Sequence, residues 1–352
     1  MHFRPATDAD AMAWQAFLAT AESGDFLHDW AWGAVAAFDG QPQRRYVLED
    51  DGIVVALVAA QERPLWRGRT FWYVPHGPVL DYRHAAAGER LRAVTVGLRE
   101  AARQHDAIAV KLEPRLETGR AELSAFQRRG LRATPETLQV GQSRIVELAD
   151  DEALLTGFDK DTRYSVRRAK REGVMVETAE DAADTAAIDA LHGLVEETQR
   201  RAGFPMPSRD RYRVAWRALA GVGRAVILEA RREGELLASG MVVIEGDRSF
   251  YLFSGSRREE RGEPKRYASY ALQWAMMRLA RDRGVRLHDL WGVAPPDAGP
   301  EHAWHGVGLF KKGFGGREVV WAGSWDLVVD PTLYRLRTAV GMLRGLAGRL
   351  RR

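Results

Sequence analysis

Three ionisable side chains stand where they could do chemistry. Lys311 lies in the glycine-rich run 308–316, and Glu113 and Asp289 each stand at the end of a strand-like segment. A fixed ammonium can pair with a diphosphate or stabilise the negative charge of a tetrahedral intermediate. Glu113 is a candidate general base, with a cap or an ion pair as the open alternative. Asp289 is interpreted in the same way, with a structural hydrogen bond as the favoured role.

A second candidate site is the basic segment from Asp159 to Gly173, which has six basic and three acidic residues. It is either a solvated helix face or a surface that contacts nucleic-acid phosphates. On the second interpretation the contacts come from four side chains: Arg163, Arg167, Arg168 and Lys170. The nine histidines show no metal-ligand spacing, so no metal site is predicted.

The composition predicts a globular protein of two domains. The chain has 352 residues, of which 45% are apolar and 28% charged, and this length exceeds what one hydrophobic core usually serves. Cysteine is absent, which excludes disulfides and thiolate chemistry. The first residues show no signal-peptide pattern, and the longest apolar run, 53–60, is too short to span a bilayer. We therefore expect a cytoplasmic protein.

The same order of elements occurs twice. The pattern predicts strand, helix and strand at 69–75, 89–104 and 107–112, and again at 248–253, 267–283 and 285–290. The two copies match at one offset, because Phe71 and Phe250, like Trp72 and Tyr251, are 179 residues apart. The chain is interpreted as two related α/β units.

Each unit is also predicted to begin with a helix and an antiparallel hairpin. In the first unit the helix is capped by Asp8 or Asp10, and a hairpin at 44–61 turns at Asp51-Gly52. In the second unit a helix at 181–202 precedes a hairpin at 225–244. This order is that of the GNAT acyltransferase fold. We therefore predict an α/β fold of two tandem GNAT-like domains, with mixed twisted sheets flanked by helices.

A series of motifs resembles the Fem family of peptidoglycan bridge aminoacyltransferases. Most specific is Phe310-Lys-Lys-Gly-Phe314, which matches the Phe-Lys-x-x-Phe part of the family signature. The other similar segments are Tyr73–Val79, Val110–Pro114, Thr162–Val174, Tyr251–Ser256 and Asp289–Gly292. They follow the family's order over nearly the whole chain.

The resemblance implies two GNAT-like domains, with the chain returning to the first after completing the second. Domain 1 would comprise 1–148 and about 317–352, and domain 2 would comprise 149–316. No long heptad pattern occurs between 178 and 290, so a short type without a coiled-coil arm is expected.

The implied activity is transfer of an amino acid from aminoacyl-tRNA to the stem-peptide amine of a peptidoglycan precursor. The precursor would be a UDP-muropeptide or lipid II. The aminoacyl ester is already activated, so no cofactor is expected.

The resemblance also implies roles for single residues. Lys311 is similar to the lysine of the family signature and is the expected catalytic residue, with Glu113 as the second candidate. The residues expected at the substrate are Tyr251, Arg209, Tyr212, Phe310 and Asp289, although Phe310 is expected chiefly to pack the loop. An arginine fork suits a diphosphate. The family lysine that follows the motif Trp30–Gly33 is replaced by Ala36 and Ala37, which leaves soluble and lipid-linked acceptors open.

Two other classes of function were weighed. An acyl-CoA-dependent N-acyltransferase would carry an Arg/Gln-x-x-Gly-x-Gly/Ala turn before a helix, and the corresponding stretches 77–82 and 257–264 lack it. A non-catalytic RNA-binding or cell-wall scaffold protein would not need the intact Phe310-Lys311 signature.

The C-terminal segment 332–352 has six arginines and no acidic residue. Its apolar residues recur at three- and four-residue steps, which predicts one helix face made of Leu333, Leu336, Val340, Leu343, Ala347 and Leu350. This helix either docks on domain 1 or lies peripherally on the anionic inner leaflet of the membrane.

Overall fold

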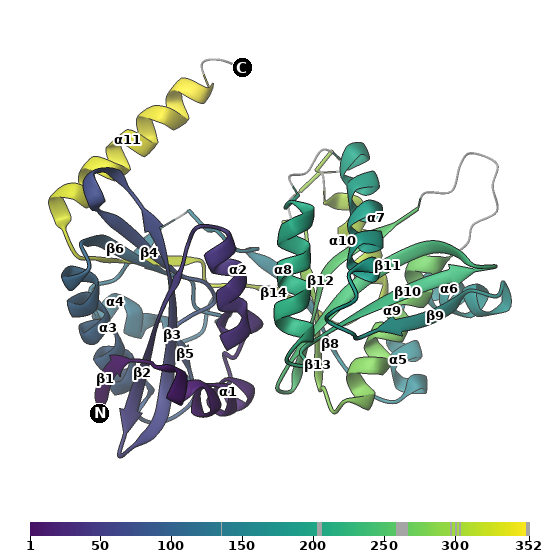
Figure 1. The fold of residues 1–352 in the computed structure, drawn as a ribbon, viewed down its shortest axis with the longest axis horizontal. Helices are drawn as coiled ribbons and strands as arrows, with labels where there is room; N and C mark the ends of the chain where they lie inside the picture. Colours follow the sequence, from purple (N-terminus) through teal and green to yellow (C-terminus); the bar gives the residue numbers. More distant parts are fainter. Residues whose placement is uncertain are drawn as a thin grey trace. The chain divides into compact units, whose positions relative to one another are not determined.

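The computed structural model describes residues 1–134, 136–202, 206–257, 267–295, 298–299, 301–302 and 304–349, without the side chains of 201–202 and 341–349. The loop 203–205, most of the stretch 257–264 compared with a CoA-binding turn, and the C-terminal side chains beyond Val340 lie outside the described residues. The chain forms two compact units, one of 1–139 with 321–352 and one of 140–320 (Figure 1).

The described part of the first unit contains one eight-stranded sheet. The strand order is β1-β2-β3-β4-β6-β15-β7, with β5 beside β3, and β4 and β6 run parallel. The strands are β1 (His2–Pro5), β2 (Gln43–Asp50), β3 (Ile53–Pro64), β4 (Thr70–Val74), β5 (Val79–Leu80), β6 (Ala107–Leu112), β7 (Arg132–Thr134) and β15 (Ser324–Val328).

Successive side chains along each strand point to opposite faces of the sheet, so the core of this unit has two layers. Tyr46 and Leu48 of β2 pack in the cluster that includes α3, whereas Val47 packs in the cluster that includes α1. Figure 1 accordingly shows α3 and α4 on one side of the sheet and α1 and α2 on the other. The helices are α1 (Ala11–Thr20), α2 (Gly33–Phe38), α3 (Ala87–Gln104), α4 (Leu123–Arg128) and α11 (Pro331–Arg349), with short 3₁₀ turns at Asp8–Asp10, Phe26–His28, Trp30–Trp32 and Trp66–Gly68.

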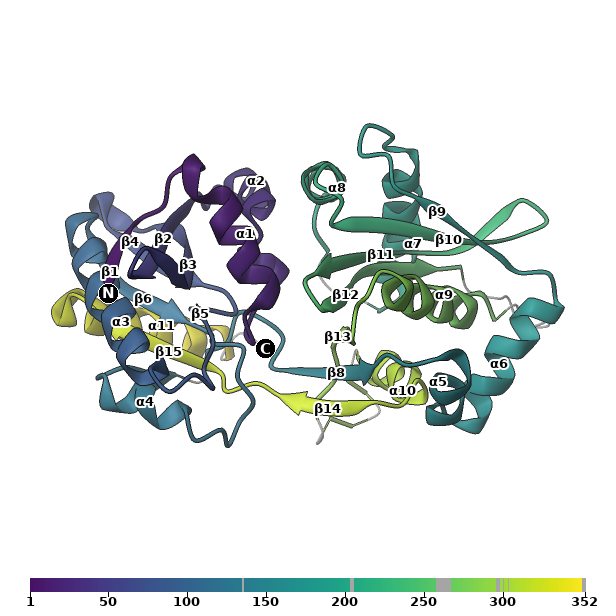
Figure 2. The same cartoon turned by 90° about the horizontal axis from the view of Figure 1, so that it is seen from below.

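The described part of the second unit contains a seven-stranded sheet of order β14-β8-β13-β12-β11-β10-β9, in which β12 and β13 are parallel. The strands are β8 (Gln142–Glu147), β9 (Met175–Ala179), β10 (Ala225–Arg232), β11 (Glu235–Glu245), β12 (Arg248–Ser256), β13 (Leu287–Gly292) and β14 (Arg317–Val320). The helices are α5 (Asp151–Gly157), α6 (Lys160–Arg171), α7 (Ala186–Ala202), α8 (Arg209–Ala220), α9 (Ala268–Asp282) and α10 (His305–Gly313). Figure 2 shows α7 and α8 on one side of this sheet and α5, α6 and α9 on the other.

Both predicted hairpins are present, and each turns where the sequence has an acidic residue followed by glycine. Asp51 and Gly52 have φ of 49° and 77°, and Glu233 and Gly234 have φ of 51° and 81°. Two consecutive left-handed residues give the turn whose twist matches that of paired strands. The strand, helix, strand order that repeats along the chain is observed as β4-α3-β6 and β12-α9-β13.

The boundary between the units differs from the one expected at 148. Strand β8 pairs with β13 and β14, so it belongs to the second sheet and the first unit's leading segment ends at Gln139. The sequence pattern did not predict β8, because this short strand has no hairpin partner next to it in the sequence and pairs with strands that lie far along the chain.

The C-terminal helix α11 contacts the first unit through its first two turns. Leu333 and Tyr334 pack beside Phe71 and Ile108, whereas Leu336 and Val340 are 51% and 39% exposed. The apolar residues expected on one helix face therefore differ in their surroundings over the part that the structure describes. Leu333 packs on the first unit, whereas Leu336 and Val340 face solvent. In the described residues no helix is long and apolar enough to cross a membrane.

Candidate functional site

The candidate site of the second unit lies where β12 and β13 stop being paired. These parallel strands pair only through Arg248–Phe250 and Leu287–Asp289. The next residues are Tyr251 on β12 and the segment 290–292 on β13. In open α/β sheets, side chains beyond the carboxyl ends of parallel strands are well placed to meet a ligand.

Near its end β13 carries a bulge, which we call the turn at Trp291. The pairing of β13 with β8 is irregular between Asp289 and Gly292, and Trp291 adopts a left-handed φ of 62°. The carboxylate oxygen Oδ1 of Asp289 accepts hydrogen bonds from the Trp291 backbone N–H, at 2.7 Å, and from the Ser143 hydroxyl. The next carbonyl, that of Gly292, faces the lysine of the signature motif.

Lys311 is buried at this turn. Its side chain is on α10, the residue is only 6% exposed, and its ammonium donates a hydrogen bond of 2.6 Å to the Gly292 carbonyl. The ammonium also lies 5.9 Å from the centre of the Tyr251 ring, within the range of a cation–π contact.

Burial changes the acidity of this group. Desolvation lowers the pKa of Lys311 to about 8, and the negative charge of Asp289 opposes that shift. Burial also raises the pKa of Tyr251 to about 12, so the phenol stays neutral and donates to Ser254. The site thus holds a lysine whose charge can be lost just above neutral pH beside a neutral tyrosine.

Helix α10 is held in place by close backbone contacts. A Cβ added at Gly313 would stand 2.2 Å from the Thr162 hydroxyl of α6, and the Gly313 carbonyl accepts a hydrogen bond from the Asp159 N–H. Phe310 contacts Tyr270 and Phe314 with ring centres 5.2 and 5.1 Å apart. The glycine and the aromatic residues of the signature therefore fix the helix that carries Lys311.

Four of the sequence-predicted site residues come together here: Lys311, Tyr251, Asp289 and Phe310. Tyr212 lies apart, stacked on Phe253 at 4.1 Å and edge-on to His192, and it is only 2% exposed. Its side chain is thus a core residue between α7, α8 and β12. Arg209 is exposed in the first turn of α8.

The basic side chains of helix α6 form two groups, one bonded within the protein and one exposed to solvent. Arg163 donates to carbonyl oxygens at the end of α5, including that of Thr156, and Arg168 pairs with Glu172 at 2.5 Å. Arg167 and Lys170 are exposed. Two of the four predicted phosphate contacts are therefore engaged within the protein.

An exposed stripe on α6 was not singled out from the sequence, although one of its residues, Arg167, was predicted to contact phosphate. It consists of Lys160, Tyr164, Arg167 and Arg171, at steps of four, three and four residues. This spacing places them on one helix face. The Tyr164 side chain is 50% exposed at the centre of that face.

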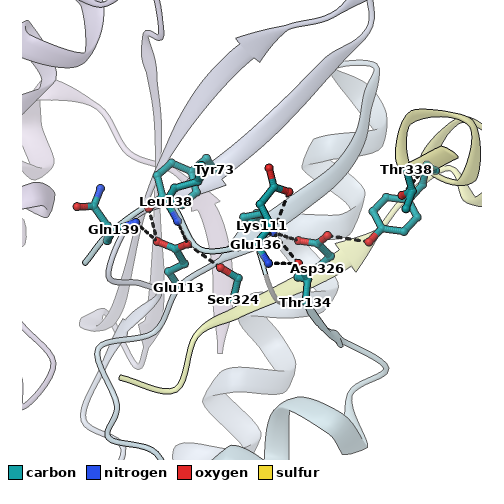
Figure 3. Close-up of polar contacts among 11 residues, drawn as sticks. Tyr73, Lys111, Glu113, Thr134, Glu136, Leu138, Gln139, Ser324, Asp326 and Thr338 are labelled. Atoms are coloured by element: carbon teal, nitrogen blue, oxygen red, sulfur yellow. Dashed lines mark hydrogen bonds and ion pairs between the residues drawn. The ribbon is translucent and has the colours of Figure 1, made fainter. Parts of the chain in front are cut away.

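Glu113 belongs to the first unit and is fully engaged there (Figure 3). One carboxylate oxygen accepts from the Leu138 N–H and the Ser324 hydroxyl, both at 2.6 Å. The other accepts from the Gln139 N–H at 3.0 Å and from the Tyr73 hydroxyl. Burial beside this carboxylate raises the pKa of Tyr73 far above its usual value, so Tyr73 remains a donor. This geometry favours a structural role for Glu113, in which it fastens 138–139 and β15 to the end of β6.

A buried ion pair lies next to Glu113. The fully buried Lys111 ammonium is 3.1 Å from an Asp326 oxygen, and Asp326 accepts a hydrogen bond from Tyr334 of α11 (Figure 3). The charges of the first unit's central strands therefore compensate one another and connect β6, β15 and α11.

Comparison with known proteins identifies the family and the fold of this chain. A family model described as the FemAB family matches residues 10–138 and 223–341. The lipid II:glycine glycyltransferase of Staphylococcus aureus (strain USA300) is 23% identical over 400 aligned residues, which cover 91% of this chain and 92% of that protein.

Solved structures show the same architecture. The crystal structure of FemX has a TM-score of 0.86 and 20% identity over 96% of this chain and 99% of that chain. A tandem GNAT protein from the clavulanic acid biosynthesis pathway has a TM-score of 0.52 and 17% identity over 94% of this chain and 99% of that chain. The fold is a tandem GNAT-like fold. With the family model covering most of its length, the chain belongs to the FemAB family.

The Glu113 geometry yields a stability prediction. In Glu113→Gln an amide N–H₂ replaces one acceptor oxygen, so two buried donors lose their partner, and we expect the free energy of unfolding to fall by about 1–3 kcal/mol. Urea denaturation measures this, with the exposed Glu100→Gln as the control. Unchanged stability combined with lost enzymatic activity would contradict the structural role and support a general base.

Proposed function

We propose that this protein is an aminoacyltransferase that moves an amino acid from aminoacyl-tRNA to the stem-peptide amine of a peptidoglycan precursor. The amine nitrogen attacks the ester carbonyl carbon, a C–N bond forms, and the C–O bond to the tRNA ribose breaks. The amine loses a proton and the ribose oxygen gains one. The family membership of the chain and the name of its Staphylococcus aureus relative support this class of reaction.

The observation that carries the proposal is the buried Lys311 ammonium beside Tyr251 at the end of β13. A tetrahedral intermediate places negative charge on the former carbonyl oxygen, and a desolvated, fixed N–H donor stabilises that charge strongly. With a pKa of about 8, Lys311 is mostly protonated at neutral pH and also acidic enough to pass a proton to the departing ribose oxygen.

The tRNA is proposed to bind at the exposed stripe of α6. Lys160, Arg167 and Arg171 are exposed cations on one face, and Tyr164 offers an exposed ring among them. Cations that neutralise phosphates and an aromatic ring that stacks on an unpaired base are the two elements of single-stranded nucleic-acid recognition. Arg163 and Arg168 support the helix in this proposal and do not contact phosphate.

The acceptor is proposed to be lipid-linked, and the protein to contact the membrane peripherally through α11. Leu336 and Val340 are exposed one turn apart, and Arg335 is exposed beside them. An exposed apolar strip with flanking cations favours the surface of an anionic bilayer. This location would bring the enzyme to a lipid-linked precursor.

The first prediction from this proposal concerns Lys311. Lys311→Met removes the charge and keeps most of the side chain's bulk, and kcat for aminoacyl transfer should fall at least about tenfold. In the parent protein the protonated lysine is lost as pH rises through about 8, so the rate should decline there. The control is Lys312→Met, because Lys312 is exposed. An undiminished kcat at saturating substrates would refute the assignment.

A second prediction concerns the α6 stripe. In the double variant Arg167→Gln/Arg171→Gln the slope of log Kd against log salt should fall by about 1–2, because up to two phosphate contacts are lost. Tyr164→Ala should weaken tRNA binding with little change of slope, because stacking is not ionic. Filter binding at several salt concentrations measures both, with Arg92→Gln/Arg103→Gln on α3 as the control. Equal slopes in the α6 variant and the parent would place the tRNA elsewhere.

A third prediction concerns α11. Leu336→Asp/Val340→Asp should reduce co-sedimentation with vesicles of anionic phospholipid, because two charges would enter the apolar part of the interface. Both side chains are exposed, so the fold should tolerate the change. Val96→Asp, at an equally exposed apolar position on α3, serves as the control. Equal sedimentation of parent and α11 variant would exclude this contact.

A further inference from the structure

The hydrogen-bond acceptor of Lys311 depends on an unfavourable backbone conformation. The Gly292 carbonyl follows Trp291, a bulky residue in the left-handed region at φ 62°. Such a conformation persists only where the surrounding structure holds it. Gly292 itself tolerates no larger residue, because an added Cβ would stand 2.8 Å from Val140 and 3.2 Å from Trp304.

Two buried side chains hold this turn. Asp289 is 2% exposed and its Oδ1 accepts from the Trp291 N–H at 2.7 Å, which ties the side chain to the backbone two residues on. Ser143 is fully buried on β8, where it stands opposite Gly292, and donates its hydroxyl to the same oxygen. Figure 2 shows that β8 and β13 lie side by side near α10, which carries Lys311.

We propose that Ser143 and Asp289 are positioning residues for Lys311: together they fix the turn at Trp291 that aims the Gly292 carbonyl at the Lys311 ammonium. Asp289 thereby acts through the backbone and not as a substrate ligand. The inference deepens the proposed function, since it rests on Lys311 being the residue that serves the transfer reaction.

Asp289 has a second effect on the same ammonium. The titratable groups that face Lys311 in the described structure are Asp289 from β13 and Tyr251 from β12, and Tyr251 is neutral. The Asp289 charge therefore favours the protonated lysine, against the effect of burial. Removing that charge should lower the pKa of Lys311, and removing the side chain should also release the turn.

The test is an NMR titration of the Lys311 side chain. The chain has six lysines, so [ε-¹³C]lysine labelling of the full-length protein gives a small set of resonances, and Lys311→Arg identifies the one from Lys311. In the parent protein this resonance should titrate near pH 8. Asn at position 289 keeps an oxygen that can accept both hydrogen bonds but has no charge, so Asp289→Asn should shift the midpoint to lower pH.

Two further variants test the positioning. Asp289→Ala removes the acceptor, and the Lys311 resonance should move towards those of the exposed Lys160, Lys170 and Lys312. Ser143→Ala should move it in the same direction by less. Asp282→Asn, a change of an exposed carboxylate in the same unit, is the control and should leave it unchanged.

The inference is overturned if the Lys311 resonance of Asp289→Ala equals that of Asp289→Asn, because the lost charge is then the whole effect. If Asp289→Ala does not fold, Ser143→Ala decides, because it removes one of the two hydrogen bonds and keeps the charge, and a Lys311 resonance equal to the parent's then overturns the inference. The rate of transfer is measured separately: Asp289→Ala should lower kcat at least about tenfold with little change in KM. A parent protein without transfer activity would refute the proposed function, and the titration would still decide the positioning.

Discussion

The second unit is organised around a buried positive charge. An ammonium removed from water is costly unless polar groups compensate it, and here the compensation comes from the Gly292 carbonyl, the Asp289 charge and the face of Tyr251. Each of these depends on another feature of the fold: the parallel strands that separate after Phe250 and Asp289, the left-handed turn at Trp291, and the glycine that lets α10 approach α6. The same burial that demands compensation also strengthens the electrostatic interactions of the ammonium, on which the proposed catalytic role rests.

The two units share a topology but use their charges differently. At the sequence offset of the repeat, Trp72 and Val110 of the first unit correspond to Tyr251 and Asp289 of the second, and both are fully buried apolar residues. The ionisable groups near the first unit's parallel strands are paired with one another: Glu113 holds four donors, and Lys111 faces Asp326. The duplicated fold therefore carries different arrangements of buried charge in its two units, because the residues at the strand ends differ.

Much of the fold and part of the site could be predicted from the sequence. Hairpins are local: an acidic residue and glycine between two strand-like runs sufficed for β2–β3 and β10–β11. Tyr251, Asp289, Phe310 and Lys311 were recognised because each lies in a contiguous motif.

The role of Glu113 could not be predicted, because one of its donors, Ser324, lies 211 residues away. Ser143 was missed for the same reason: its partner, Asp289, lies 146 residues along the chain. The contacts of Arg163 could not be predicted, because composition cannot show that an arginine donates to carbonyls at the end of the preceding helix.

Formation of the peptide bond itself tests the central claim most directly. The purified protein would be incubated with a tRNA carrying an isotope-labelled amino acid and with a peptidoglycan precursor, either lipid-linked or UDP-linked, and the acceptor would be analysed by mass spectrometry. The account predicts an acceptor heavier by one labelled residue, joined through the stem-peptide amine, and none of this product with Lys311→Met in the same time. Labelled product at the same rate from Lys311→Met, or no product from the parent protein over a panel of aminoacyl-tRNAs with both acceptors, would contradict it.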